Sequence, residues 1–441
     1  MPWINQLREH IGKEVTLRGW VFNRRDSGKV RFVLLRDGTG ICQCVFVASE
    51  VSPELFELAD GVNQEALVDI KGIIREFDRA PGGVELAAQS LNVIADSVDY
   101  PITPKEHGID FLLSRRHLWL RSSRQHALLR CRDTLVRGFH DFFGERDFTL
   151  VDPPMITPTS CEGTTELFEI SYFDNKAYLS QSGQLYMEPA AAAFGKAYCL
   201  APSFRAEKSK TRRHLTEFWH LEPEVAFADL DEIMVLAEQM LCHVTGKLLE
   251  KREGELELLG TRGKNKPEKK VFKEHIELLR NLKPPFYRIS YTEAVELLTR
   301  KGVKFEWGQK FGADEEAVIS REFEKPVFCH RYPQKSAPFY MKQDPDNPEL
   351  VKNFDLLAPE GYGEIIGGSQ REDNLQRLEA AIERHKIDRE PLEWYLDLRR
   401  YGTFVHSGFG VGIERTLAWI SQTHHIRETI PYPRLMDRIY P

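Results

Sequence analysis

The residues best placed to do chemistry lie in one stretch, 203–224. Arg205 and Glu207 are two residues apart in a strand-like run, so their side chains project from the same face. A mostly positive run follows at 208–214, where mutual repulsion is tolerable only if solvent or an anion offsets it. Phe218 comes next, in a second strand-like run. A solvated hairpin tip would explain the charge, but not the opposed Arg, Glu and Phe on the flanking strands. The stretch therefore favours a polyphosphate site.

The composition is typical of a soluble globular protein of two or three domains. The chain has 441 residues, of which 41% are hydrophobic and 29% charged, and its net charge is −7. A nucleic-acid partner would therefore have to be held by local basic patches. The seven cysteines show no paired CxxC spacing, which favours reduced thiols. Without a long apolar run or a signal-peptide core, we expect a cytoplasmic protein that does not enter a membrane.

The first 98 residues predict a small closed β-barrel. Five short strand-like runs are separated by turns, which favours an OB-fold. Such barrels bind single-stranded nucleic acid on a face that carries aromatic and basic side chains. Phe32, Gln43 and the basic cluster that includes Arg24 suit this use. Alternation alone also allows Phe32 to be a core residue.

The rest of the chain predicts an α+β domain built on an antiparallel sheet flanked by helices. Residues 99–114 are rich in Pro and Gly and predict a linker, with the second domain at 115–441. Pro153 and Pro154 cannot lie inside a central strand, so their segment is expected at a sheet edge or an interface. A charged, weakly patterned stretch at about 250–288 predicts a surface insertion, to which we assign no function.

The runs FRAE, RRHLTEF and GFGVGIERT make this sequence similar to the class II aminoacyl-tRNA synthetases of the aspartyl, asparaginyl and lysyl subgroup. The likeness covers nearly the whole chain, with the barrel first and then three class motifs in order. That ordered set is more specific than any one motif, because Gly-rich turns that enter helices are common. The resemblance implies an enzyme that uses ATP to join an amino acid to tRNA through an aminoacyl-adenylate, with release of AMP and pyrophosphate.

The resemblance also implies roles for individual residues in ATP binding. Arg205 would hold the α-phosphate and the amino-acid carboxylate, since a planar guanidinium can bind two oxygens at once. The other ATP-binding residues would be Glu207 on the adenine amino group, Phe218 stacked on the purine, Arg213 and His214 at the γ-phosphate, Gly412 where the backbone approaches closely, and Arg415 on the opposite side of the nucleotide.

Asp355 and Glu364 match the magnesium-binding acids of the family, although either could be a surface acid. Mg²⁺ is usually held by one or two carboxylates together with phosphates and water. The implied reaction is an in-line attack on the α-phosphorus, in which Arg205, Arg415 and Glu364 act by positioning and charge stabilisation. Pro154 falls at the proline of the family's first motif, which implies a homodimer.

The segment SQSGQLYMEP, residues 180–189, bears on the choice of amino acid. Aspartyl enzymes resemble S-P-Q-L-Y-K-Q here, and their lysine pairs with the substrate carboxylate. In this chain Gly183, Met187 and Glu188 replace the proline, the lysine and the glutamine. Aspartate would be left underpaired in a dehydrated pocket, at a cost of roughly several kcal/mol. Met187 could also be a packing residue and Glu188 a surface acid.

The family likeness implies a pocket that suits L-asparagine and a tRNA-Asn partner. Glu222 would accept from the side-chain amide and Arg371 would hold the amide oxygen. Glu162, Ser182 and Gln184 complete the expected amino-acid site, in which Glu162 and Gln184 bind the α-amino group. An aspartyl enzyme, including one that charges both tRNAs, is the nearest alternative. A catalytically silent RNA-binding paralogue is an alternative of a different class.

The same likeness makes the barrel an anticodon-binding domain. Phe32 would stack on the middle uridine, Gln43 would contact the first anticodon base, and Arg24 would contact the backbone. Aspartate and asparagine anticodons share the two bases concerned, so the barrel cannot separate the two specificities and the pocket has to.

Overall fold

The computed structural model describes residues 1–159, 161, 167–208, 211–261 and 269–441. The described chain divides into two compact units, Met1–Gly108 and Ile109–Pro441. The division falls inside the stretch for which a linker was predicted. Each unit has its own hydrophobic core.

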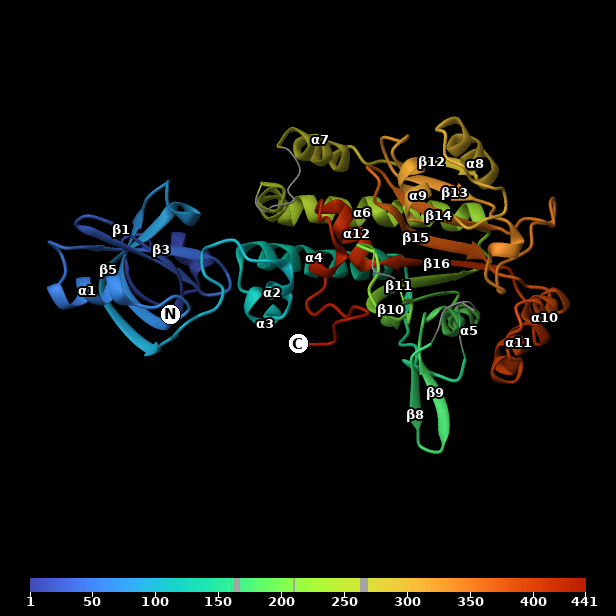
Figure 1. Ribbon diagram of the computed structural model, residues 1–441, viewed down its shortest axis with the longest axis horizontal. Helices are drawn as coiled ribbons and strands as arrows, with labels where there is room; N and C mark the ends of the chain where they lie inside the picture. Colours follow the sequence, from blue (N-terminus) through green and yellow to red (C-terminus); the bar gives the residue numbers. More distant parts are fainter. Residues whose placement is uncertain (160, 162–166, 209–210, 262–268) are drawn as a thin grey trace. The chain divides into compact units, whose positions relative to one another are not determined.

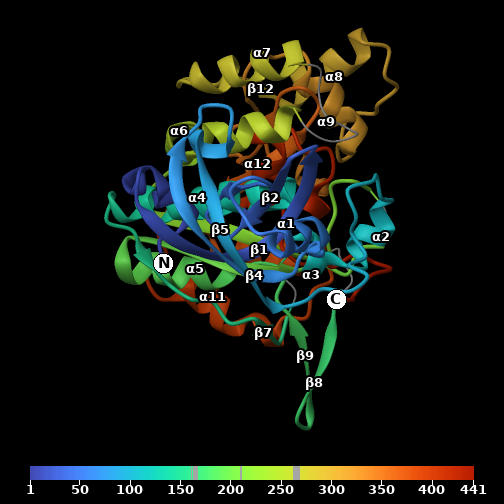
Figure 2. The ribbon, with the colours of Figure 1, turned by 90° about the vertical axis from the view of Figure 1, so that its left-hand side faces the viewer.

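The first unit is a closed barrel with the strand order β1-β2-β3-β5-β4 (Figure 2). Its strands are β1 (Glu14–Ser27), β2 (Val30–Arg36), β3 (Ile41–Val47), β4 (Leu67–Glu76) and β5 (Val84–Ala95), with α1 (Pro53–Gly61) between β3 and β4. Alternation places Val33 and Leu35 of β2 in the core, whereas Phe32 is half-buried and lies on the opposite face of the strand. The core alternative for Phe32 is therefore wrong.

The second unit is built on a large mixed sheet, most of whose strand pairs are antiparallel (Figure 1). Among the described residues the order is β12-β13-β14-β15-β16-β11-β10-β6, and only the β12–β13 and β10–β6 pairs are parallel. The bounds are β6 (Thr149–Leu150), β10 (Lys196–Phe204), β11 (Glu217–Ala226), β12 (Tyr287–Ser290), β13 (Val327–His330), β14 (Asn353–Ala358), β15 (Gly363–Gln370) and β16 (His406–Gly412). A smaller sheet, in the order β7-β9-β8, comprises β7 (Ile156–Thr157), β8 (Glu169–Tyr172) and β9 (Asn175–Leu179).

Several helices in the described part of the chain bury their apolar faces in one core with this sheet, and the following ones carry much of it. They are α4 (Ser123–Gly144), α6 (Leu230–Thr261) and α12 (Ile413–Ile420), of which α4 and α6 pack side by side (Figure 1). Phe139, Phe142 and Phe143 of α4 are fully buried, since they recur on one face at helical spacing. Burial of this face supplies much of the unit's hydrophobic stabilisation.

The stretch at 250–288 differs from the predicted surface insertion. Its first part continues α6, and α7 (Lys269–Arg280) follows residues 262–268, which lie outside the described part of the chain. Leu256, Leu259, Phe272 and Ile276 are buried in the main core. The charged residues between them obscured this apolar face, because composition averages over a helix whose two faces differ.

The remaining short elements connect or flank these layers. They are η1 (Ile4–His10), η2 (Pro81–Gly83), α2 (Ile109–Leu113), α3 (Arg116–Trp119), α5 (Gln184–Phe194), α8 (Tyr291–Arg300), α9 (Ala313–Ser320), η3 (Gln334–Ser336), α10 (Leu375–Arg384), η4 (Glu390–Leu392), α11 (Glu393–Arg400) and η5 (Ile426–Glu428). No helix in the described part of the chain combines the length and apolarity needed to cross a membrane.

Candidate active site

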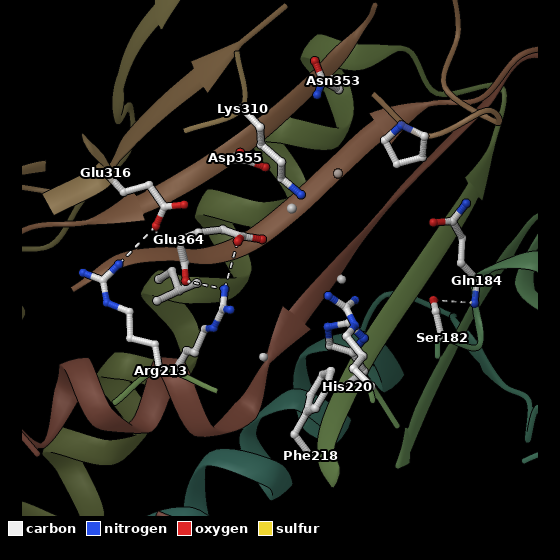
Figure 3. Close-up of a pocket in the computed structure, with 18 of the residues that line it drawn as sticks. Ser182, Gln184, Arg213, Phe218, His220, Lys310, Glu316, Asn353, Asp355 and Glu364 are labelled. Atoms are coloured by element: carbon white, nitrogen blue, oxygen red, sulfur yellow. Dashed lines mark hydrogen bonds and ion pairs between the residues drawn. The ribbon is translucent and has the colours of Figure 1, made fainter. Parts of the chain in front are cut away.

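One pocket on the large sheet brings together most of the predicted site residues (Figure 3). Strands β11, β14, β15 and β16 supply much of its lining, together with the start of α12 and Arg205, which directly follows β10. The predicted residues that line it are Ser182, Gln184, Arg205, Glu207, Arg213, His214, Phe218, Glu222, Asp355, Glu364, Arg371, Gly412 and Arg415. Residues from distant parts of the sequence meet here because their strands are neighbours in the sheet.

Arg205 and Phe218 come from the two strands of one hairpin. Arg205 directly follows β10, and its backbone N–H donates to the carbonyl of Thr216 just before β11. Its guanidinium carbon lies 5.3 Å from the centroid of the Phe218 ring. An aromatic plane beside a guanidinium offers a stacking surface next to a donor for anionic oxygens. This end of the pocket can hold a purine and an adjoining phosphate.

Arg213 and His214 are oriented by nearby acceptors. Arg213 pairs with Glu316 of α9 at 3.2 Å, and it also donates to the carbonyl of Gly361. His214 Nε2 lies 3.6 Å from a carboxylate oxygen of Glu207. Burial, followed by the charge of Arg415, lowers the pKa of His214, so the imidazole is neutral near pH 7 and can donate one hydrogen bond without a full charge.

Asp355 and Glu364 converge over Gly367 from the adjacent strands β14 and β15. A side-chain carbon at Gly367 would lie 3.1 Å from an oxygen of Glu364 and 3.4 Å from one of Asp355. Burial, and then the charges of Glu364 and Glu316, raise the pKa of Asp355 well above its usual range. Burial also opposes ionisation of Glu364, but Arg415, whose Nη1 lies 2.8 Å away, lowers its pKa.

This pair of hard carboxylate oxygens fits Mg²⁺. A bound cation would relieve the repulsion that raises the pKa of Asp355. Among the described residues no group of three or more His, Cys, Asp or Glu side chains is arranged to hold a metal. Mg²⁺ commonly uses only one or two protein carboxylates and completes its shell with phosphate and water oxygens. The two converging acids can therefore supply the protein's share of the ligands.

Glu222 is buried on β11 and fixes the start of α5. One carboxylate oxygen accepts from the backbone N–H of Gly183 at 2.7 Å, and the other accepts from the hydroxyl of Ser182. Burial opposes ionisation, but His220 and these hydrogen bonds lower the pKa of Glu222 to about 2. The pocket thus contains an ionised carboxylate, which attracts an amide N–H₂ group and repels a second carboxylate.

Arg371 follows β15 and is tied to its neighbours. Its Nε and Nη2 donate to the two oxygens of Glu224 at 3.0 and 2.9 Å, and its Nη1 donates to Ser369 at 2.8 Å. A guanidinium has five N–H donors, so these three bonds hold the group rigidly and leave donor capacity towards the pocket. Its charge is largely offset by Glu224.

Several pocket residues were not anticipated from the sequence. They are His220, Lys310, Glu316, Tyr332, Tyr340, Met341 and Asn353. Lys310 comes from the loop before α9, and Figure 3 shows its side chain directed towards Asp355 and Glu364. His220 lies inside the stretch 203–224 but was given no role there. The other residues belong to none of the motifs recognised in the sequence, so only the tertiary packing around β14 and β15 reveals them.

Five predicted residues lie elsewhere or are not described. Glu162 lies outside the described residues, and Pro154 follows the edge strand β6. In the barrel, Gln43 is buried and its amide oxygen accepts from Arg25 at 2.7 Å. The guanidinium of Arg25 lies 4.6 Å from the Phe32 ring centroid, so Phe32 and Gln43 share one basic neighbour. Arg24 immediately precedes Arg25 on β1, and its side chain is exposed.

The surface-acid alternative for Glu188 is wrong. Its side chain is fully buried and accepts from Tyr395 and Arg399, each at 2.8 Å. Met187 is also fully buried. The local sequence did not reveal the burial of Glu188, because its partners come from α11 and β16.

A closed barrel followed by a mostly antiparallel sheet with a polyphosphate pocket defines the architecture of a class II tRNA synthetase. The family model of tRNA synthetases class II (D, K and N) matches residues 108–436, and that of the OB-fold nucleic acid binding domain matches residues 15–94. The chain therefore belongs to the class II tRNA synthetases of the D, K and N group. The OB-fold predicted for the N-terminal region is confirmed.

Relatives resemble the chain over its full length. It is 54% identical to an asparagine–tRNA ligase from Desulforamulus reducens, over 99% of both chains. It is 51% identical to an asparagine–tRNA ligase from Sorangium cellulosum, over 99% of this chain and 98% of that one. Among solved structures, the asparaginyl-tRNA synthetase from Pyrococcus horikoshii complexed with asparaginyl-adenylate matches with a TM-score of 0.93 and 43% identity, over 100% and 99% of the two chains.

Proposed function

We propose that this protein is an asparagine–tRNA ligase, which joins L-asparagine to tRNA-Asn with ATP as the energy source. The observation that carries the proposal is the identity of about half of all residues, over the full length, with asparagine–tRNA ligases. The reaction passes through asparaginyl-adenylate and releases pyrophosphate and then AMP. The support from the pocket is that the residues proposed to contact the purine, the phosphates and the amino acid line one cavity.

In the proposed first step, the asparagine carboxylate attacks the α-phosphorus of ATP. Arg205 holds the reacting carboxylate and α-phosphate together, while Phe218 and Arg415 enclose the nucleotide. Arg213 and His214 hold the terminal phosphate that leaves as pyrophosphate. Since both reactants are bound in place, positioning and charge stabilisation account for the acceleration without a protein nucleophile.

Asp355 and Glu364 would hold Mg²⁺ in the proposed enzyme. When bound, the ion neutralises charge on the phosphate oxygens. The support is their convergence above Gly367 beside Arg415. Arg415 keeps Glu364 ionised, which maintains a carboxylate ready for the cation.

The proposed preference for asparagine over aspartate follows from charge. An aspartate side chain would meet the ionised Glu222, whereas an amide can donate to it. Arg371 would offer its remaining donors to the amide oxygen, but its pairing with Glu224 reduces its attraction for a carboxylate. Ser182 and Gln184 lie on the same side of the pocket (Figure 3). Glu162 is proposed as a further ligand of the α-amino group.

Amino-acid-dependent exchange of pyrophosphate into ATP tests this function. We expect exchange with asparagine and little with aspartate, followed by charging of tRNA-Asn. Faster exchange with aspartate would make the chain an aspartyl enzyme. Binding of tRNA without exchange for either amino acid would make it a silent RNA-binding protein.

We further infer that the active form is a cytoplasmic homodimer. Leu150, Met155 and Ile156 flank Pro154 at a sheet edge, and they are 48%, 51% and 44% exposed. Exposed apolar residues beside an edge strand suit burial against a second copy. All seven cysteines are free, which fits a reducing compartment. Light scattering should give a molar mass twice that of one chain. A measured mass equal to that of one chain would contradict the proposed homodimer.

The barrel is proposed to bind the tRNA anticodon through Arg24, Phe32 and Gln43. Phe32 lies on the face of β2 opposite the core, next to the basic Arg25. An aromatic ring beside a cation is a common platform for an unstacked base.

A further inference from the structure

Glu188 is a buried carboxylate behind the amino-acid end of the pocket. It lies on α5, and its side chain is fully buried. One oxygen accepts from Tyr395 at 2.8 Å, and the other accepts from Arg399 at 2.8 Å and lies 3.0 Å from Nε2 of His406. Its partners belong to α11 and β16, so one carboxylate joins three elements.

Two series of hydrogen bonds connect the Glu188 carboxylate to residues that line the pocket. The side-chain amide of Gln184, which lines the pocket, donates to Glu188 at 3.3 Å. Arg399, which donates to Glu188, also donates through Nε to the backbone carbonyl of Glu372 at 2.8 Å. Glu372 is the residue directly after Arg371 in the sequence. The backbone N–H of Arg371 in turn donates to the carbonyl of His406 at 3.0 Å. A substitution at Glu188 would therefore alter the positions and the electrostatic environment of both Gln184 and Arg371.

The charges in this region offset one another. Burial opposes ionisation of Glu188, but Arg399, His406 and Arg371 hold its pKa well below the usual range. Glu224 pairs with Arg371 in the same buried region, at 2.9 Å. Two carboxylates thus face two guanidinium groups and one imidazole. Loss of one carboxylate would leave positive charge in excess in a medium that screens it poorly.

We propose that Glu188 is a specificity-determining residue whose negative charge offsets the buried cations behind Gln184 and Arg371. With this charge in place, the pocket wall favours a neutral carboxamide over a carboxylate. Glu188 does not line the pocket, so it acts through Gln184 and Arg371 as a positioning residue. The inference rests on the proposed asparagine-dependent reaction and names a source of its selectivity.

The test compares asparagine with aspartate in pyrophosphate exchange. Glu188→Gln keeps the shape but removes the charge, so we expect the ratio of kcat/KM for asparagine to kcat/KM for aspartate to fall about tenfold or more. Arg399→Met removes the opposite charge and should shift the ratio in the opposite direction. The double variant Glu188→Gln with Arg399→Met should return the ratio to near its original value.

Tyr395→Phe is the matched control, because it removes a hydrogen bond to the same carboxylate without a change of charge. Its ratio should stay within about threefold of the original protein's. Equal losses with both amino acids in Glu188→Gln, or a double variant that keeps the altered ratio, would overturn the inference. If Glu188→Gln does not fold, the direction of the Arg399→Met shift still decides. Absence of asparagine-dependent exchange in the unmodified protein would instead reject the proposed function.

Discussion

At the scale of single residues, Arg205 is the side chain that must bind both reactants at once in the proposed reaction. It would touch both reactants, and its position is set by a backbone hydrogen bond across the β10–β11 hairpin and by the nearby Phe218 ring. A guanidinium can bind two oxygens in one plane, which an ammonium cannot. The identity of this side chain should therefore matter as much as its charge.

We predict that Arg205→Ala lowers the rate of asparaginyl-adenylate formation by roughly a hundredfold to a thousandfold. Arg205→Lys should restore little of it, since the bidentate geometry is lost. Single-turnover adenylate formation measures this, with tRNA binding as the check on folding. Arg300→Ala, which alters an exposed arginine at the end of α8, is the control. Equal loss of tRNA binding would indicate misfolding and contradict the assigned role.

Glu222 gives a prediction for stability against pH. Its pKa falls from 4.5 in the unfolded chain to about 2 in the folded one. A lowered pKa stabilises the fold above the unfolded value, and that stabilisation disappears as the pH falls towards the folded value. The ionised group therefore contributes on the order of 3 kcal/mol near neutral pH, which is lost between about pH 4.5 and pH 2.

We expect Glu222→Gln to be less stable than the original protein near pH 7, and the difference should shrink as the pH is lowered through this window. Urea unfolding at several pH values measures it. The exposed acid Glu324, changed to Gln, should show no such pH-dependent difference. A difference that stays constant down to about pH 2 would show that Glu222 is not held ionised.

At the scale of elements, helix α7 is joined to the nucleotide end of the pocket. His275 is buried, with Nε2 3.1 Å from the carbonyl of Ile420 and Nδ1 3.0 Å from Glu360. The next carbonyl, that of Gly361, accepts from Arg213. The helix therefore supports the turn that orients a proposed phosphate-binding side chain.

We predict that His275→Ala raises the KM for ATP about threefold to tenfold and leaves the KM for asparagine unchanged. The variant should also lose about 1–3 kcal/mol of stability, because it removes the hydrogen bonds of a fully buried imidazole. Steady-state pyrophosphate exchange separates the two constants. His243→Ala, which alters a histidine packed against Phe142, controls for a general loss of stability. Equal changes in both KM values would contradict a specific link to Arg213.

At the scale of the whole molecule, the barrel and the catalytic unit are separate compact bodies with separate cores. The residues proposed for adenylate formation all belong to the second unit. Changes on the barrel surface should therefore affect steps that involve tRNA and leave amino-acid activation unaltered.

We expect Phe32→Ala to lower kcat/KM for tRNA charging by about 10-fold to 100-fold, since stacking of one base on an aromatic ring contributes about 1–3 kcal/mol. Pyrophosphate exchange should not change. Phe56→Ala is the matched control, because Phe56 also lies beside an arginine, at 4.5 Å, but belongs to α1. If both variants impair charging equally, Phe32 has no special contact with the anticodon.

The fold class and most of the proposed catalytic residues could be predicted from the order of residues along the chain. The barrel follows from strand alternation, and Arg205, Phe218 and Arg415 lie in motifs whose residue types and order report their chemistry. Local pattern is sufficient there, because strand period and motif spacing are properties of contiguous residues.

The roles that depend on partners far away in the chain became apparent only from the folded arrangement. Glu188 became a buried charge because α11 and β16 surround it, and Glu316 joined the pocket because α9 packs beside Arg213. The stretch at 250–288 proved to carry core residues for the same reason. Burial and electrostatic environment arise from long-range packing, which no local pattern of residue types encodes.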